Sequence, residues 1–288
     1  MNGNLRLALQ KKGRLTDKSL ELLRLCGMDI ENYSERLVVT ARNFPLDILF
    51  LRDDDIPEYV QDCVADVGIV GEDVIYEKQI PSVVIEKLGF GRCSLMLAYP
   101  ENNELKKLED IDGKTIATTY PKILKDFLKS KDLNAKIIEL SGSVEIAPSL
   151  GVADLICDIV STGNTLMMNK LKKSFKVFDS EAVLISANSS LKDEKKNEYL
   201  SDIRRRIQSV MTARSSKYLM MNIPKESLVK IIDIIPSLKS PTVLHLAEEN
   251  MLAVHAVIPS DSFWHIIGDL KSAGASGILL LPIENLIQ

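Results

Sequence analysis

Apolar positions in this chain form short runs that alternate with segments of helical spacing. Such runs predict strands at Leu5–Leu9 and Leu155–Val160, among others. A helix is expected after the first strand, from residue 19 to residue 26, with Thr16 or Asp17 as its cap. Because strands and helices alternate, we expect an α/β protein whose sheets are covered by helices.

The stretch from Ala153 to Leu166 combines three features that suit a phosphorylated sugar. A buried strand containing Asp158 is followed by a small polar loop around Gly163 and then by helical composition. Such a loop aims backbone N–H groups and a helix N-terminus at an anion. The Asp158 carboxylate can accept hydrogen bonds from both hydroxyls of a ribose diol. The stretch therefore predicts a 5-phosphoribosyl site, with an ordinary strand–turn–helix as the alternative.

A second stretch, Ala65–Asp73, repeats the same order of residues and elements. Both stretches contain Ala-Asp, an apolar strand, a Gly-containing loop and a helix. Two similar α/β lobes would place these loops at the carboxyl ends of their strands, where open sheets bind ligands. The basic loop at Lys11 and Arg14 is a further candidate anion contact, with a solvated loop as the alternative. We therefore expect a cleft between two lobes.

Two other groups of residues invite a metal-site interpretation that their context does not favour. The acidic run at 53–55 precedes Pro57 and a helix, so helix capping and the helix dipole explain it more simply. The three histidines, His245, His255 and His265, fall on three different expected elements without a cysteine or carboxylate pattern. Structural or surface roles are the better interpretation for them.

The pattern changes from Lys217 onward. The order of expected elements becomes βαββαβ, which is the ferredoxin-like arrangement. Its parts are a strand, a helix, a hairpin, a helix capped by Asp261 and a last strand, at 218–222, 225–235, 242–258, 261–273 and 277–281. Nothing in this segment suggests catalysis. By analogy of fold alone, such an appended domain is expected to pair between subunits and to hold an effector.

The composition of the chain fits a soluble globular protein of two or three domains. Its 288 residues are 45% hydrophobic and 26% charged, with a formal net charge of −4. This charge provides no basic surface for nucleic acid or an anionic membrane, and no apolar run approaches membrane-spanning length. The N-terminus lacks a signal-peptide pattern. The cysteines lack metal-ligand spacing and are expected to be small core residues, so we expect a cytoplasmic protein.

Together, the motifs of the chain resemble those of the ATP phosphoribosyltransferase family. The segments that carry the resemblance lie at 9–15, 52–57, 66–73, 142–148 and 153–166. Their order and spacing match the family along essentially the whole chain. The segment Tyr218–Gln288 resembles the regulatory domain of the long form, which needs no separate regulatory subunit.

The resemblance implies an α/β fold of two periplasmic-binding-protein-like lobes and a C-terminal ferredoxin-like βαββαβ regulatory domain. Lobe I would be discontinuous, formed by residues 1–93 and 183–214. Lobe II, with the phosphoribosyl diphosphate loop, would span 94–182, and the regulatory domain would span 215–288. The chain would assemble with copies of itself, as a dimer and a homohexamer.

The implied reaction is transfer of the 5-phosphoribosyl group of phosphoribosyl diphosphate to N1 of ATP. Pyrophosphate leaves with inversion at the anomeric carbon, in the committed step of histidine biosynthesis. Mg²⁺ would bridge the diphosphate and bind largely through substrate phosphates and water, so no all-protein metal site is expected. No general base is expected either, because adenine N1 already carries a lone pair. Histidine would act as a feedback inhibitor, and AMP is expected to bind as well.

Roles from the family can be carried over to the matching positions. The phosphoribosyl diphosphate contacts would be Asp154, Asp158, Ser161, Thr162, Gly163, Asn164 and Thr165. The ATP contacts would be Lys11, Arg14, Glu72, Asp73 and Tyr120, and the residues acting directly in catalysis Asp158, Arg14 and Lys11. The histidine contacts would be Leu238, Thr242, Ala275 and Ser276. Alternatively, Asp154 simply precedes its strand and Tyr120 is a packed residue.

Two other classes of protein remain as alternatives. A bilobal solute-binding protein would share the fold, but it would usually carry a signal peptide. A purine-salvage-type phosphoribosyltransferase would share the phosphate loop, but it would have an acidic pair where this chain has Cys157 and Asp158. It would also leave the basic N-terminal loop and the appended C-terminal domain unexplained.

Overall fold

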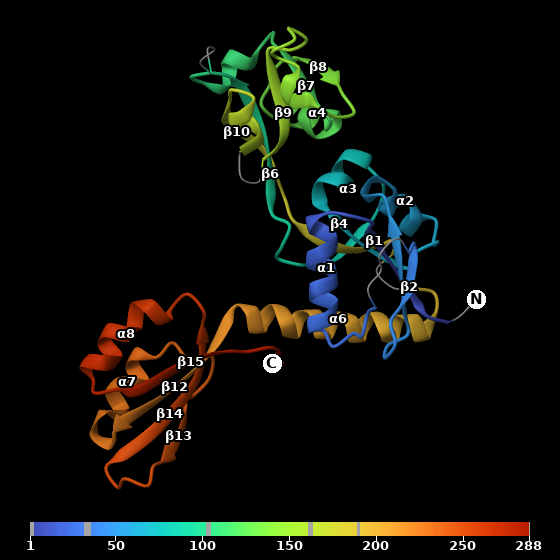
Figure 1. The fold of residues 1–288 in the computed structure, drawn as a ribbon. Coiled ribbons are helices and arrows are strands. Elements are labelled where there is room, and N and C mark those ends of the chain that lie inside the picture. The colour runs from blue at the N-terminus through green and yellow to red at the C-terminus, as the bar shows by residue number, and fades with distance from the viewer. Residues whose placement is uncertain (1–2, 32–35, 102–104, 161–163, 189–190, 288) are drawn as a thin grey trace. The chain divides into compact units, whose positions relative to one another are not determined.

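A computed structural model describes residues 3–31, 36–101, 105–160, 164–188 and 191–287 of the chain (Figure 1). The chain divides into two compact units. The first holds nearly all residues up to Leu200, and the second holds the residues from Ser201 onward together with Leu25–Gly27. In the described ranges, no helix is both long and apolar enough to cross a membrane.

The first unit contains a sheet of six strands in the order β2-β3-β1-β4-β11-β5. The bounds of its strands, in that order, are Val38–Thr40, Leu46–Leu51, Leu5–Gln10, Val67–Gly71, Ala182–Ser186 and Val83–Lys87. Strand β1 is parallel to both β3 and β4, whereas β11 is antiparallel to β4 and β5. A Cβ on Gly68 of β4 would lie 2.6 Å from a methyl carbon of Ile56, so only glycine lets helix α2 (Ile56–Gln61) approach this sheet so closely.

A second sheet in the same unit has five strands in the order β10-β6-β9-β7-β8. The bounds, in that order, are Leu171–Ser180, Cys93–Pro100, Leu155–Val160, Thr115–Thr118 and Lys136–Glu139. Strand β9 is parallel to β7, and β7 is parallel to β8. Two sheets, each with helices, confirm the prediction of two α/β lobes, while the domain boundaries given above remain a prediction.

The helical segments of the first unit lie between these strands. Their bounds are Arg14–Leu25 (α1), Asp53–Asp55 (η1, a 3₁₀ turn), Ile56–Gln61 (α2), Glu72–Lys78 (α3), Leu108–Ile111 (η2), Pro121–Ser130 (α4), Val144–Ile146 (η3) and Asn164–Met168 (α5). Helix α1 begins at Arg14, earlier than predicted. The Thr16 hydroxyl donates to the Gln10 carbonyl oxygen at 2.8 Å, so it ties the helix to β1 instead of capping it. The segment after β8 forms only the short 3₁₀ turn η3.

The chain returns from the second sheet to the first between Ser180 and Ala182. From the sequence, the strands at 175–178 and 182–185 are expected to run back toward the first lobe. The earlier segment still belongs to the second sheet, where β10 pairs with β6. Only β11 joins the first sheet, where it pairs with β4.

The long helix α6 spans Glu194–Arg214. The elements that follow it in the second unit are Ser216–Pro224 (β12), Lys225–Ser227 (η4), Leu228–Ile234 (α7), Thr242–His245 (β13), Met251–Pro259 (β14), Phe263–Ser272 (α8) and Ser276–Pro282 (β15). The sheet order is β13-β14-β12-β15, as in a ferredoxin-like domain, so the βαββαβ prediction is confirmed. Alternate residues of the strands bury against α7 and α8, for example Leu219 and Val254 against Ile231 and Leu270. Asp261 is not the cap of α8, because Ser262 occupies the N-cap position.

Candidate active site

Three loops of the first lobe share one edge of its sheet. Because β1 lies between β3 and β4 and is parallel to both, the carboxyl ends of these strands are neighbours. The basic loop at 11–13, the acidic turn at 53–55 and the start of α3 at Glu72 all follow these ends. Lys11 and Arg14 are exposed there. This is the edge at which open α/β sheets bind ligands.

The second lobe has an equivalent edge. Its parallel strands β9, β7 and β8 end at residue 160, Thr118 and Glu139 respectively. The segments that follow are the predicted phosphate loop, the Thr119–Tyr120 pair and the turn at Ser141. Of the phosphate loop, Ser161, Thr162 and Gly163 lie outside the described residues, as does the side chain of Asn164. Thr165 is exposed on α5.

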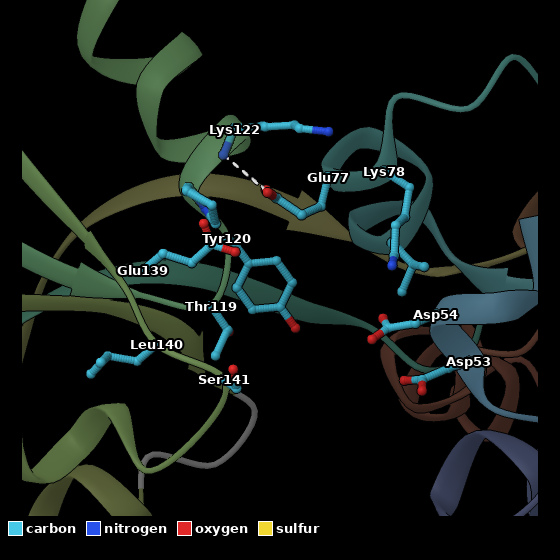
Figure 2. Close-up of a pocket in the computed structure, with 12 residues that line it drawn as sticks. Asp53, Asp54, Glu77, Lys78, Thr119, Tyr120, Lys122, Glu139, Leu140 and Ser141 are labelled. Carbon is cyan, nitrogen blue, oxygen red and sulfur yellow. Dashed lines mark hydrogen bonds between the residues drawn. The ribbon is translucent and has the colours of Figure 1, made fainter.

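Residues from both edges line one cavity of about 520 Å³. Figure 2 shows Asp53, Asp54 and Lys78 of the first lobe on one side, and Tyr120 and Ser141 of the second lobe on the other. A cavity between the two lobes is therefore present, but among the described residues only Tyr120 of the predicted substrate contacts lines it. Asp53 and Asp54 were interpreted from the sequence as capping residues. Asp55, at the N-cap position of α2, makes no side-chain cap bond to the described residues, and the other two line the cavity.

Asp158 lies near the carboxyl end of β9, half-buried and directly before the predicted phosphate loop. Its Oδ1 accepts a hydrogen bond from the Ile159 backbone N–H at 2.7 Å. Burial raises the pKa of its carboxyl group above the ordinary value, while the bond from Ile159 opposes that shift. A half-buried carboxylate at this edge is well placed to meet a diol.

Asp154 lies at the opposite end of the same strand. Its Oδ2 accepts the Thr115 backbone N–H at 2.8 Å, and this contact joins β9 to β7. Four residues of extended chain separate it from Asp158, which is about 13 Å. The structure therefore does not bring the two predicted carboxylates together, and Asp154 takes the alternative role that the sequence left open.

Tyr120 borders the cavity next to Asp158. Its backbone N–H donates to the buried Thr118 hydroxyl at 2.9 Å, and that hydroxyl donates to the Cys157 carbonyl oxygen at 2.7 Å. The Tyr120 ring points into the cavity (Figure 2). Burial, and then the nearby carboxylates of Asp73 and Asp158, raise the pKa of its hydroxyl. Tyr120 therefore remains a neutral hydrogen-bond donor at the cleft.

Glu72 and Asp73 follow β4, and both have partners within the chain. The Glu72 carboxylate is 2.9 Å from the Lys87 ammonium. Asp73 is only 7% exposed and accepts a hydrogen bond from the Ser180 hydroxyl, which in turn accepts the Asp73 backbone N–H at 3.1 Å. These two candidate ATP contacts are therefore tied to the segments that connect the lobes.

Comparisons with known proteins agree with this geometry. The family model "ATP phosphoribosyltransferase" matches residues 52–209, and the model "HisG, C-terminal domain" matches residues 213–285. Relatives named ATP phosphoribosyltransferase from Cytophaga hutchinsonii and Bacteroides thetaiotaomicron are 46% and 48% identical, over 100% and 98% of this chain and 100% and 99% of their own lengths. The chain belongs to the ATP phosphoribosyltransferase family. It is therefore an enzyme, a transferase of histidine biosynthesis.

A solved structure of the same family agrees with the fold. The ATP phosphoribosyl transferase (HisG:HisZ) complex from Thermotoga maritima is similar to this chain with a TM-score of 0.59 at 30% identity. The match covers 71% of this chain and 98% of that chain. Membership of this family excludes both alternative classes that the sequence left open.

The candidate histidine contacts of this family member fall into two groups in the second unit. Leu238 and Thr242 line a cavity of about 240 Å³ together with Tyr218 and His255. Ala275 and Ser276 are at the start of β15, which is the opposite edge strand of the sheet from β13. Two strands therefore separate the groups within one chain.

His255 is a polar side chain in the lining of this cavity. Its Nδ1 is 2.9 Å from the Tyr218 hydroxyl oxygen. Its Nε2 is buried and has no hydrogen-bond partner among the described residues. In the described ranges no group of three or more His, Cys, Asp or Glu side chains is arranged to hold a metal ion.

The buried Asp73 predicts a pH dependence of stability. Burial raises the pKa of its carboxyl group above 3.8, although the hydrogen bond from Ser180 opposes this shift. A raised pKa means that its stabilising contribution is full below 3.8 and is lost as the pH rises through the folded-state pKa. The Asp73→Asn variant cannot ionise there, so its free energy of unfolding should increase relative to the parent as the pH rises above 3.8.

Urea unfolding of parent and variant at several pH values measures this difference. The raised pKa of Asp158 is common to both proteins and cancels from the comparison. If the difference in free energy of unfolding between Asp73→Asn and the parent stays constant or shrinks as the pH rises, the raised pKa of Asp73 is contradicted.

Proposed function

We propose that the cavity between the two lobes binds both substrates of the family's reaction, with each lobe holding one of them. The enzyme transfers the 5-phosphoribosyl group of phosphoribosyl diphosphate to N1 of ATP and releases pyrophosphate. The observation that carries the proposal is that loops from the carboxyl ends of parallel strands in both sheets line the same cavity. One edge offers the predicted phosphate loop, and the other offers a basic loop.

The second lobe holds the phosphoribosyl half in this proposal. The loop residues, through their amides and hydroxyls, bind the 5-phosphate: Ser161, Thr162, Gly163, Asn164 and Thr165. Asp158 accepts hydrogen bonds from the ribose hydroxyls, since it directly precedes that loop. Asp154 takes no part, because it lies at the far end of β9 and pairs with Thr115.

The first lobe holds ATP. Lys11 and Arg14 contact its phosphates, and Arg14 can do so with two parallel hydrogen bonds. The Tyr120 hydroxyl of the second lobe donates a hydrogen bond to ATP across the cleft. Glu72 and Asp73 would contact ATP only after breaking their bonds to Lys87 and Ser180. We therefore assign them a structural role in the first lobe.

Attack by the adenine N1 lone pair on the anomeric carbon breaks its bond to pyrophosphate, with inversion. Positive charge develops on the ribose ring and negative charge on the leaving group, so catalysis is chiefly positioning and charge stabilisation. Asp158 holds the ribose, and Lys11 and Arg14 stabilise the phosphate charge. The Asp53 and Asp54 carboxylates on the cavity wall would be suitable oxygen ligands for Mg²⁺, which would neutralise part of the phosphate charge.

Feedback inhibition belongs to the C-terminal unit in this proposal. Histidine binds at the cavity that Leu238 and Thr242 line, and AMP also binds the enzyme. The protein acts in the cytoplasm as a homo-oligomer, a dimer that assembles to a hexamer. Ala275 and Ser276 contribute to the histidine site from across the sheet or from a neighbouring copy.

An assay with defined substrates tests the assignment. The protein is mixed with ATP, phosphoribosyl diphosphate and Mg²⁺, and the absorbance of the product is followed with and without histidine. Product should form, should require Mg²⁺, and should decrease when histidine is added. Formation of product from free purine bases but not from ATP would contradict the proposed reaction. A rate that histidine does not change would contradict the proposed feedback inhibition.

A further inference from the structure

One side chain of the first lobe completes a helix of the second lobe. Glu77 lies on α3, and its Oε1 accepts the Lys122 backbone N–H at 3.0 Å. Its Oε2 accepts the Ile123 N–H at 3.1 Å and lies 3.2 Å from the Lys122 nitrogen. Figure 2 shows the Glu77 side chain reaching across to Lys122 at the start of α4.

The start of α4 needs such a partner. The first amides of a helix have no acceptor within the helix, and a negative charge there is favoured by the helix dipole. Tyr120 occupies the N-cap position and makes no side-chain cap bond to the described residues, while Pro121 has no N–H. The Tyr120 amide is bonded to Thr118. The amides of Lys122 and Ile123 therefore remain, and Glu77 takes both.

A second contact joins the same helix to the second lobe. The ring of Tyr76, next to Glu77 on α3, packs edge-on against the ring of Phe178 on β10, with centroids 4.8 Å apart and planes at 61°. Aromatic pairs of this geometry are attractive beyond the area they bury. Helix α3 is therefore held to the second lobe at two points, one polar and one apolar.

The polar contact lies in the wall of the cavity. Glu77, Thr119, Tyr120 and Lys122 all line the cavity. We propose that Glu77 is a positioning residue that holds the Thr119–Lys122 wall against α3 and thereby sets the width of the substrate cavity. This proposal rests on the assignment of the cavity as the substrate cleft.

Kinetics of Glu77 variants test the positioning role. Glu77→Ala removes both acceptors, whereas Glu77→Gln keeps one. We expect Glu77→Ala to raise KM for the substrates about fivefold, the effect of losing one helix cap on an equilibrium, with little change in kcat. Glu77→Gln should restore part of the affinity. Glu58→Gln is the matched control, because Glu58 is an exposed helical residue of the same lobe that does not line the cavity.

Hydrogen–deuterium exchange provides a readout that needs no substrate. In Glu77→Ala, the amides at the start of α4 should exchange faster than in the parent, while those of Glu58→Gln should not change. Unchanged exchange at Lys122 and Ile123 would overturn the contact itself. Faster exchange with unchanged KM would overturn the positioning role, and so would a fall in kcat at constant KM. If instead the cavity does not bind the substrates, the faster exchange in Glu77→Ala should still be seen. The exchange result therefore distinguishes failure of the Glu77 contact from failure of the substrate assignment.

Discussion

The Asp158→Asn variant is expected to lose about a hundredfold in kcat while keeping its fold, the loss typical of removing one transition-state hydrogen-bonding group. The carboxylate sits half-buried at the end of β9, where it can accept from both ribose hydroxyls. An amide offers only one acceptor oxygen and turns donor hydrogens toward the other hydroxyl. The ribose is then held less firmly just as charge develops on it.

Steady-state kinetics and circular dichroism of Asp158→Asn measure both halves of this expectation. Asp154→Asn is the informative comparison, because it changes the same chemical group in the same strand. Its carboxylate bonds to Thr115 away from the cavity, so kcat should stay within about twofold of the parent. Near-normal kinetics for Asp158→Asn would refute the diol role. Equal losses of kcat in Asp158→Asn and Asp154→Asn would contradict the different roles that the structure indicates for the two carboxylates.

The Thr242→Val variant is expected to need about tenfold more histidine for half-inhibition, with an unchanged rate in its absence. Valine keeps the branched shape of threonine at the start of β13 but removes the hydroxyl of this cavity-lining residue. A hydrogen bond to a charged ligand such as an amino acid contributes roughly this much to binding. Inhibition curves at fixed substrate concentrations measure the shift.

Two further variants make the result specific. Ser272→Ala is the control, since that hydroxyl bonds to the Gly268 carbonyl oxygen within α8. Ser276→Ala tests the other edge of the sheet. If the Thr242 and Ser276 variants both lose inhibition, both edges of the sheet contribute to histidine binding, although two strands separate them within one chain. An unchanged response of Thr242→Val to histidine would contradict the assignment of the cavity.

Local patterns were enough to predict most elements of the fold. Apolar runs bounded by polar turns predicted β1 and β9, and the alternation in the C-terminal segment predicted the order βαββαβ. The repeat of Ala-Asp, strand, loop and helix also predicted that two sheet edges would face one cleft. Each predicted strand and helix depends on residues close together in the sequence, where periodicity is informative.

Contacts between distant residues could not be predicted in the same way. Asp73 and Ser180 are 107 positions apart, and Glu77 and Lys122 are 45 positions apart. Capping was also misjudged, because a hydroxyl such as that of Thr16 can bond to a neighbouring strand instead of its own helix. Cys63 and Cys93 were expected in the core, but Cys63 is exposed in the turn that follows α2, and Cys93 is only half-buried.

The position of β11 in the first sheet has a consequence for how the chain is made. This strand lies between β4 and β5, although all five strands of the second sheet separate it from β5 along the chain. During synthesis, β5 therefore emerges from the ribosome long before the strand that pairs with it. The second lobe can complete its sheet in the meantime, since domains generally fold as units as they emerge. The lobe whose synthesis begins first is thus the one whose sheet is completed last.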